Sequence, residues 1–369
     1  MASKVRFLLM PKLMRRTLPL LLLLAGLSLL APSAFAQNPL PHAPILITND
    51  RDFLRCAWVV AGNGTAAAPF QIGPWKIDDL SQGFAVKIGN TKGKITQFFT
   101  LVGITSNPPL GSVDPGSAVV WITHVSQDTL VQNTTANAAG IGVYVVQSRH
   151  IRIGGSSLNK MLGSGHVVVS SSNLVVTNSK LKSEQSGMVL KDSAYVSVGG
   201  DLACAQATDC NDFTYDEAYG LLILNSHDVL VEGLNAAAND TAGILLNGKG
   251  TYHVEVRASR ASGNGPICHT MQPSGLREHT GLEVDHNGGI VLINGAHDNF
   301  IHDNAADGDA GFDLRSGGDG LFLDPCTGAV VPVPTSAPMG ANNRFAPGPN
   351  CYTTTNISPP PPKAMKCPG

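Results

Sequence analysis

Histidine and carboxylate side chains are concentrated in one part of this 369-residue chain. Six of the eleven histidines lie between residues 253 and 302, and aspartates and glutamates lie among them. Carboxylates combined with histidine can perform acid–base chemistry on a sugar chain, because one group donates a proton while another accepts one. The candidate catalytic residues are Asp285, His286, His297, Asp298, His302 and Asp303.

Soft metal ligands in the same region suggest a second kind of chemistry. Cys268 and Met271 are separated by two residues, one of which is His269. Thiolate, thioether and imidazole groups suit copper. Asp307 and Asp309 flank a glycine and offer oxygen ligands for calcium, although a solvated turn has the same composition. The cofactor is therefore unknown from the sequence, with copper and calcium as the two candidates.

A structural role competes with both kinds of site. The phrase from Gly220 to Asp228 ends in Ser-His-Asp, and a similar phrase from Gly289 ends in His297-Asp298, 69 residues further on. Aspartate and histidine side chains often hydrogen-bond at turns. We interpret His227-Asp228 as a corner, because Asp228 occupies the same place in its phrase as Asn173. For His297-Asp298 and His302-Asp303 both interpretations stay open.

The repeated phrase belongs to a longer internal repeat. A glycine opens an alternating apolar run at positions separated by 23, 22, 33, 23 and 46 residues: Gly142, Gly165, Gly187, Gly220, Gly243 and Gly289. A second short apolar run follows most of the first runs, and a serine precedes it in four rows. A period near 23 residues with two or three short strands is typical of a solenoid whose stacked coils share one core. The side chains predicted to point inward are Val143, Val145, Val168, Met188, Leu190, Leu221, Ile223, Ile244, Leu246, Ile290 and Leu292.

These rows resemble the pectate-lyase-like right-handed β-helix superfamily. The resemblance is carried by the phrase Gly-x-x-[Val/Ile/Leu] followed by Ser-x-[Asn/Asp/His]-[Val/Ile]-x-[Val/Ile], and it is clearest over residues 140–304. It implies an all-β fold, a right-handed single-stranded parallel β-helix. It implies little about activity, because the superfamily contains polysaccharide lyases, glycoside hydrolases, epimerases, adhesins and proteins that mature a copper enzyme.

The chain is expected to be organised around this β-helix. Residues 1–36 are predicted to be a signal peptide, with a basic start, an apolar run and a small-x-small cleavage site that ends at Ala36. Residues 37–61 are expected to form an N-terminal cap segment, 62–324 the β-helix with regular coils over 140–304, and 325–369 a Pro- and Cys-rich C-terminal cap and tail. The mature protein is expected to be secreted or periplasmic. No later apolar segment is long enough for a membrane span.

The cysteines and the net charge indicate disulfide bonds and limit the class of partner. All seven cysteines follow the predicted signal peptide, and an exported chain with this many cysteines is expected to form disulfides. Cys204 and Cys210 lie in the insert that lengthens one repeat, and we predict a bond between them. The chain after residue 36 carries 20 basic and 27 acidic residues, a net charge of −7. That charge argues against a nucleic-acid partner.

The sequence therefore predicts an exported β-helix protein whose partner is a polysaccharide or cell-envelope glycan. An enzyme of this kind would be a polysaccharide lyase or a glycoside hydrolase. The alternative is a non-catalytic structural or surface protein, or one that handles copper. The fold does not decide between them.

Overall fold

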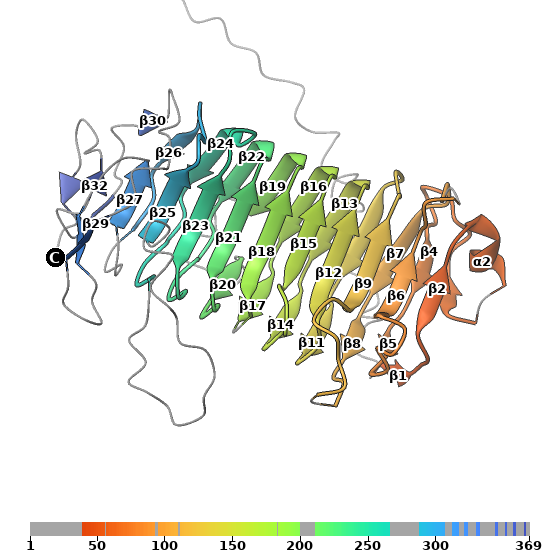
Figure 1. Ribbon diagram of the computed structural model, residues 1–369. Helices are drawn as coiled ribbons and strands as arrows, with labels where there is room; N and C mark the ends of the chain where they lie inside the picture. The colour runs from red at the N-terminus through yellow and green to blue at the C-terminus, as the bar shows by residue number, and fades with distance from the viewer. Residues whose placement is uncertain are drawn as a thin grey trace, which may run out of the picture. The chain divides into compact units, whose positions relative to one another are not determined.

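The computed structural model describes residues 39–55, 57–92, 95–109, 111–182, 184–199, 211–265 and 288–306, and the backbone of short strands beyond them. Nearly all of the regular structure is β-strand, and the strands form three sheets in which almost all neighbours run parallel (Figure 1). Each regular coil contributes one strand to sheet B and then one to sheet C, and the coils up to β20 (Asp212–Thr214) add a short strand to sheet A, which later coils continue only as isolated bridges. This is the predicted parallel β-helix.

Sheet A consists of β1 (Leu40–Pro41), β5 (Trp75–Lys76), β8 (Ile104–Ser106), β11 (Thr135–Asn137), β14 (Ser157–Asn159), β17 (Lys180–Lys182) and β20 (Asp212–Thr214). Sheet B consists of β2 (Ile45–Ile47), β6 (Phe84–Ile88), β9 (Ala118–Thr123), β12 (Ile141–Val146), β15 (His166–Val169), β18 (Ser186–Lys191), β21 (Tyr219–Leu224), β23 (Ala242–Asn247), β25 (Gly288–Ile293), β27 (Phe312–Ser316) and β32 (Ile357–Ser358). Sheet C consists of β3 (Val59–Ala61), β4 (Phe70–Ile72), β7 (Phe99–Val102), β10 (Thr129–Gln132), β13 (Arg149–Gly154), β16 (Ser172–Thr177), β19 (Ala194–Gly199), β22 (His227–Glu232), β24 (Tyr252–Arg257), β26 (Phe300–His302) and β30 (Arg344–Phe345).

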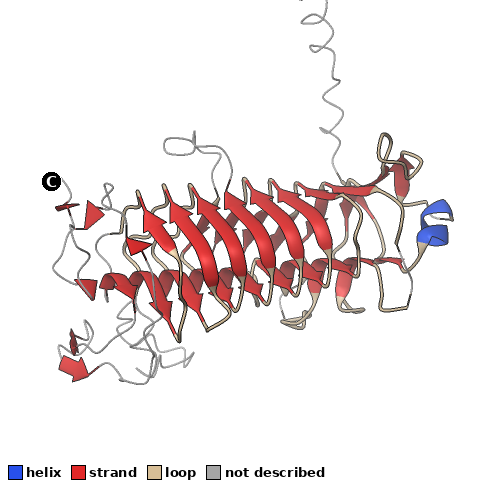
Figure 2. Ribbon diagram, turned by 90° about the horizontal axis from the view of Figure 1, so that it is seen from above, coloured by secondary structure: helices blue, strands red, loops and turns tan. Residues whose placement is uncertain are grey.

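The ends of the described chain depart from this pattern. The helix α2 (Asp50–Leu54) lies beside the first strands at one end of the stack (Figures 1 and 2). Asn49 begins the helix with a capping box, in which its side chain and that of Asp52 exchange hydrogen bonds with the backbone. Near the other end of the sequence, β28 (Leu321–Leu323) pairs antiparallel with β29 (Val330–Pro332), and β31 (Cys351–Tyr352) pairs parallel with β33 (Met365–Lys366). Among the described residues, no helix has the length and apolar character needed to cross a membrane.

The core is a column of apolar side chains that the repeat predicted. Met188 pairs with Leu221, Leu221 with Ile244, and Ile244 with Ile290 along sheet B. Every side chain predicted to point inward is at most 1% exposed. The second apolar runs form the strands of sheet C, whose alternate valines, leucines and isoleucines fill the same interior. The period of 23 residues is therefore one coil, as predicted.

The glycine that opens each row is required by close contact between coils. A Cβ atom on Gly142 would lie 2.1 Å from a methyl carbon of Leu158 and 2.5 Å from the carbonyl oxygen of Gly165. A Cβ atom on Gly220 would lie 2.8 Å from the carbonyl oxygen of Gly243. No side chain fits at these distances, so the repeat keeps a glycine at this point of the coil.

Polar side chains form ladders at the corners between sheets. Ser171 accepts a hydrogen bond at Oγ from the amide of Ser148 (3.1 Å), and Ser193 and Ser226 continue the series with donor–acceptor distances of 3.1 and 3.0 Å. These are the four serines of the repeat. Each serine hydroxyl accepts a hydrogen bond from a backbone amide of the preceding coil. The ladder therefore satisfies amides that lie at the corners, where the sheets provide no partner.

Several predictions lie outside the described residues. They concern the signal peptide, the Cys204–Cys210 disulfide and the copper ligands Cys268, His269 and Met271. The aspartates proposed for calcium, Asp307 and Asp309, also lie outside. Of the tail, the structure describes only the backbone of its short strands.

Candidate functional site

The three His-Asp pairs of the described chain share one local geometry. In each pair the aspartate has a positive φ, at 53° for Asp228, 52° for Asp298 and 54° for Asp303. The preceding histidine donates from Nδ1 to the aspartate Oδ2 over 2.8, 2.7 and 2.7 Å respectively. The pair is thus a corner motif in which aspartate tolerates the left-handed conformation. Asp228 continues a row of left-handed residues that includes Asn173 (φ 55°), in agreement with the corner interpretation.

The predicted catalytic residues that are described lie at the two ends of one strand. His297 and Asp298 precede β26, whereas His302 and Asp303 are at its end and just after it. Three residues, 299–301, lie between the two pairs. The structure therefore brings each histidine to its own aspartate and holds the two pairs apart. Asp285 and His286 lie outside the described residues, so the complete set remains a prediction.

A groove lies on the outward face of sheet C, over β16, β19, β22 and β24. Its volume is about 510 Å³. Its floor contains the outward side chains at the middle of these strands, and one wall contains the left-handed corner row. The lining residues are Asn173, Leu174, Val175, Tyr195, Val196, Ser197, Asp228, Val229, Leu230, His253 and Glu255. We call this surface the sheet C groove.

Flat rings form a row along the corner side of the groove. His227, Tyr252 and His297 occupy equivalent positions in three successive coils. The His227 and Tyr252 rings are parallel within 5° with centroids 4.7 Å apart, and the Tyr252 and His297 rings lie within 9° at 5.5 Å. Tyr195 approaches His227 edge-on at 6.2 Å, and 59% of Tyr195 is exposed. The coil spacing of a parallel sheet brings such rings into stacking contact.

Asp228 is held in its charged form at the wall of the groove. His227 donates to one carboxylate oxygen at 2.8 Å, and His253 of the next coil donates to the other at 3.3 Å. The hydrogen bond from the His227 side chain is the main cause that lowers the pKa of Asp228, and burial opposes it. Asp228 is therefore suited to accept a proton or a hydrogen bond.

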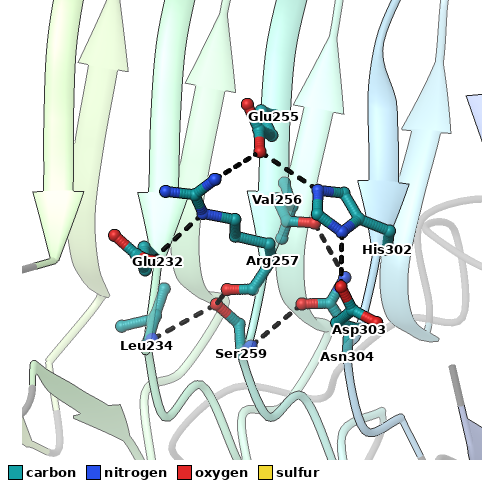
Figure 3. A network of polar contacts seen from close by, with 9 residues as sticks. All are labelled: Glu232, Leu234, Glu255, Val256, Arg257, Ser259, His302, Asp303 and Asn304. Atoms are coloured by element: carbon teal, nitrogen blue, oxygen red, sulfur yellow. Dashed lines mark hydrogen bonds and ion pairs between the residues drawn. The ribbon is translucent and has the colours of Figure 1, made fainter. Parts of the chain in front are cut away.

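Glu255 belongs to a charged network that extends from the groove to the far edge of sheet C (Figure 3). Arg257 donates from Nε to Glu232 at 3.1 Å and from Nη1 to Glu255 Oε1 at 3.0 Å. The same oxygen of Glu255 lies 3.0 Å from Nε2 of His302, whose Nδ1 contacts Asp303. The hydrogen bond with Glu232 is the main cause that raises the pKa of Arg257. Arg257 thus remains a cation that fixes two carboxylates.

The backbone beneath this network is fixed by a polar corner (Figure 3). Ser259 donates to the carbonyl oxygen of Arg257 at 2.9 Å and accepts from the amide of Leu234 at 3.2 Å. Asn304 accepts from the Ser259 amide at 2.9 Å and donates to the carbonyl oxygen of Val256 at 2.9 Å. Because these groups come from three consecutive coils, they hold Arg257 and His302 in register.

A second group of titratable side chains lies inside the coils, away from the groove. Asp216 is buried, and burial raises its pKa to about 9. Burial, followed by the charge of Asp216, raises the pKa of Glu184 well above its ordinary value. Burial lowers the pKa of His166 to about 4. Asp216 and His166 are therefore neutral near pH 7, and burial disfavours the charged form of Glu184.

Sequence reasoning missed Tyr195 and Glu255 as members of a site. The signal was present, because Ser197, Leu230 and Glu255 occupy the middle x of the Val-x-Val runs, which must face outward. Within the described residues, no group of three or more histidine, cysteine, aspartate or glutamate side chains has a metal-binding arrangement. The copper ligands predicted from the sequence lie elsewhere in the chain.

Comparison with known proteins gives the following findings. A family model described as "Right handed beta helix region" matches residues 117–327, more than half of the chain. No curated protein matches the chain in sequence. Among solved structures, the chain is similar to pectate lyase Pel9A, with 12% identity, 70% of each chain covered and a TM-score of 0.41. It is also similar to the Azotobacter vinelandii mannuronan C-5 epimerase AlgE6 A-module, with 12% identity, 80% and 81% covered and a TM-score of 0.39. The periplasmic alginate epimerase AlgG gives 12% identity, 83% and 85% covered and a TM-score of 0.35.

Proposed function

The chain belongs to the right-handed β-helix family, and we propose that its sheet C groove binds a polysaccharide chain. The observation that carries the proposal is the pair of exposed rings, Tyr195 and His253, beside two carboxylates in the lining of an open groove. The apolar C–H faces of sugar rings pack on flat rings, and sugar hydroxyl groups donate to carboxylates. The rings of Tyr195 and His253 supply the first kind of contact, and Asp228 and Glu255 supply the second.

The place of action follows from the predicted signal peptide. Export would expose the groove to a cell-envelope or extracellular glycan, which is the partner that the sequence analysis expects. The site is an open groove rather than a closed cavity. An open groove can bind an internal segment of a long polysaccharide as well as its end.

The two carboxylates could also act on the bound chain. Asp228 has a lowered pKa and would serve as a base, because a group that stays ionised cannot supply a proton at neutral pH. Glu255 lies in the same groove on the adjacent strand and would be the second carboxylate. In a lyase reaction Asp228 would remove the proton next to a uronate carboxyl group while the glycosidic oxygen at C4 leaves and takes up a proton. In hydrolysis it would deprotonate a water molecule that attacks the anomeric carbon, while the second carboxyl group protonates the departing glycosidic oxygen. Release of new sugar ends from a bound glycan is therefore the readout for catalysis, and Glu255→Gln should abolish it.

Replacement of one exposed ring tests binding. Tyr195→Asn removes the ring and keeps a residue that tolerates positive φ, as Asn173 does in the neighbouring coil. Isothermal titration with a panel of oligosaccharides should show one or more ligands whose Kd rises about tenfold in this variant, or about 1.4 kcal/mol.

The chain contains a matched control for this variant. Tyr215 is also a tyrosine at positive φ (63°), and 63% of it is exposed, but it does not line the groove. Tyr215→Asn should leave the Kd unchanged. The proposal is wrong if no oligosaccharide binds the intact protein, or if both tyrosine variants weaken binding equally.

A further inference from the structure

We infer that the glycan bound in the sheet C groove is positively charged, with amino groups on its sugar units. The inference rests on the proposed function and concerns the ligand class of the same groove. The lining contains two carboxylates, Asp228 and Glu255, and neither lysine nor arginine. An anionic chain would meet unbalanced like charge, whereas a cationic chain would meet its counter-ions.

The nearest guanidinium does not neutralise the groove. Arg257 donates to Glu232 and to Glu255, so one cation serves two carboxylates. Glu232 and Arg257 are the last residues of β22 and β24, and neither belongs to the groove lining. A ligand in the groove therefore experiences the carboxylates more strongly than the guanidinium.

Glu255 presents one oxygen to a ligand. Its contacts with Arg257 and His302 both fall on Oε1. In Figure 3 the other carboxylate oxygen points away from both partners. The side chain is 36% exposed. This carboxylate is fixed in position by its neighbours, and its second oxygen can face the positive charge of an ammonium group.

The exposed ring of Tyr195 supports the same ligand class. A cation is attracted to the face of an aromatic ring, and the combination of rings with carboxylates is a common arrangement for binding substituted ammonium groups. Tyr195, Asp228 and Glu255 all line the groove, on three consecutive strands of sheet C. The groove therefore offers rings for the sugar faces and carboxylates for the amino groups.

Three oligosaccharides of equal length and different charge test the inference. The probes are hexamers of N,N,N-trimethylglucosamine, N-acetylglucosamine and galacturonate, titrated into the full chain by calorimetry at pH 8.0. This pH is above the ordinary imidazole pKa, and the trimethylated probe stays charged. The cationic hexamer should bind at least tenfold more tightly than the neutral one and the anionic one most weakly. An increase of NaCl from 50 to 500 mM should reduce the cationic preference.

Two variants and a control assign the preference to the groove. Asp228→Asn and Glu255→Gln should each weaken binding of the cationic hexamer about tenfold and of the neutral hexamer less than threefold. Glu217→Gln, an exposed acid beyond the groove, should change neither. Equal or tighter binding of the neutral or anionic hexamer would overturn this inference alone. Absence of binding by any of the three hexamers would overturn the proposed function as well.

Discussion

Asp216 and Asp228 are twelve residues apart in the chain, but one is buried inside the coils and the other lines their outer surface. Asp216 is buried inside, and its pKa is raised to about 9 by burial. Asp228 lines the outer groove, and the hydrogen bond from His227 lowers its pKa. The same residue type is therefore a neutral component of the interior on one side and a charged ligand candidate on the other. Solvent access and the partner, rather than residue type, determine its chemistry.

The interior acid occupies a position that asparagine holds in later coils. Asp216 accepts at Oδ1 from the amide of Glu184 (3.1 Å), Asn239 accepts from Asp216 (3.0 Å), and Asn264 accepts from Asn239 (3.0 Å). A protonated carboxyl group resembles an amide in shape and hydrogen bonding. The ladder thus uses Asp216 as a substitute for asparagine, with Oδ1 as the acceptor.

The strongest test of the comparison places one new acid inside the coils and another on their outer surface. Ile223 is fully buried, so Ile223→Asp should lower the free energy of unfolding by several kcal/mol, because the core offers the charge no partner. Val175 faces outward in register with Arg152, so Val175→Asp should change it by less than about 1 kcal/mol. Urea unfolding measures both. Similar losses in the two variants would mean that the interior and the outer surface are not two different environments.

A smaller effect is expected from the pH dependence of the interior acid. Asp216 binds a proton in the folded chain between its ordinary pKa and about 9, whereas the unfolded chain has released it. The free energy of unfolding should therefore decrease as the pH rises from 5 to 8, by about 1.4 kcal/mol per pH unit for each such group. Asp216→Asn should remove one group's share of this slope and stabilise the protein most at pH 8.

Urea unfolding of both proteins at pH 5, 6.5 and 8 measures the slope. Glu217→Gln is the control, since Glu217 is exposed next to Asp216 and should not alter it. An unchanged slope in Asp216→Asn would show that Asp216 is ionised in the folded protein. Asp228 contributes with the opposite sign, because its pKa is lowered: its stabilisation is present above the ordinary aspartate pKa and is lost as the pH falls below it.

The smallest effect is expected at the outer edge of sheet C. Arg257→Met keeps the side-chain stem but leaves Glu232 and Glu255 without their shared cation. We expect a loss of about 1–2 kcal/mol in the free energy of unfolding, measured by thermal and urea unfolding at pH 7.5. The Arg257→Met/Glu232→Gln double variant should lose less than the single one, and strictly additive losses would contradict a coupled network.

The fold could be predicted from the sequence because the same pattern of glycine and alternating apolar residues recurs in several coils. Gly220, Gly243 and Gly289 open three successive coils, although the second of these coils is 46 residues long, and alternate apolar residues specify which face is buried. A period-2 pattern repeated in register leaves few alternatives, since a slip by one residue would turn every core side chain outward. The left-handed corner at Asp228 followed from the same repetition.

The site could be predicted only in part. His297 and His302 attracted attention because histidine and aspartate are dense there, yet local corner geometry accounts for both pairs. Tyr195 and Glu255 were missed because they are 60 residues apart and become neighbours only through the stacking of β19, β22 and β24. Which residues become neighbours across coils depends on the length of each coil, including its inserts. The identity of a single residue does not indicate which residues will lie beside it.

The equal spacing of the coils has a consequence for how this protein could change over time. Every corner of one coil meets an equivalent corner of the next, as in the series Ser148, Ser171, Ser193 and Ser226. A duplicated stretch of one period would find matching partners on both sides. Each added unit would lengthen the row His227–Tyr252–His297 by one position. Duplication of one repeat in the gene would therefore be enough to lengthen this surface by one coil, and with it the segment of polysaccharide that the surface could contact.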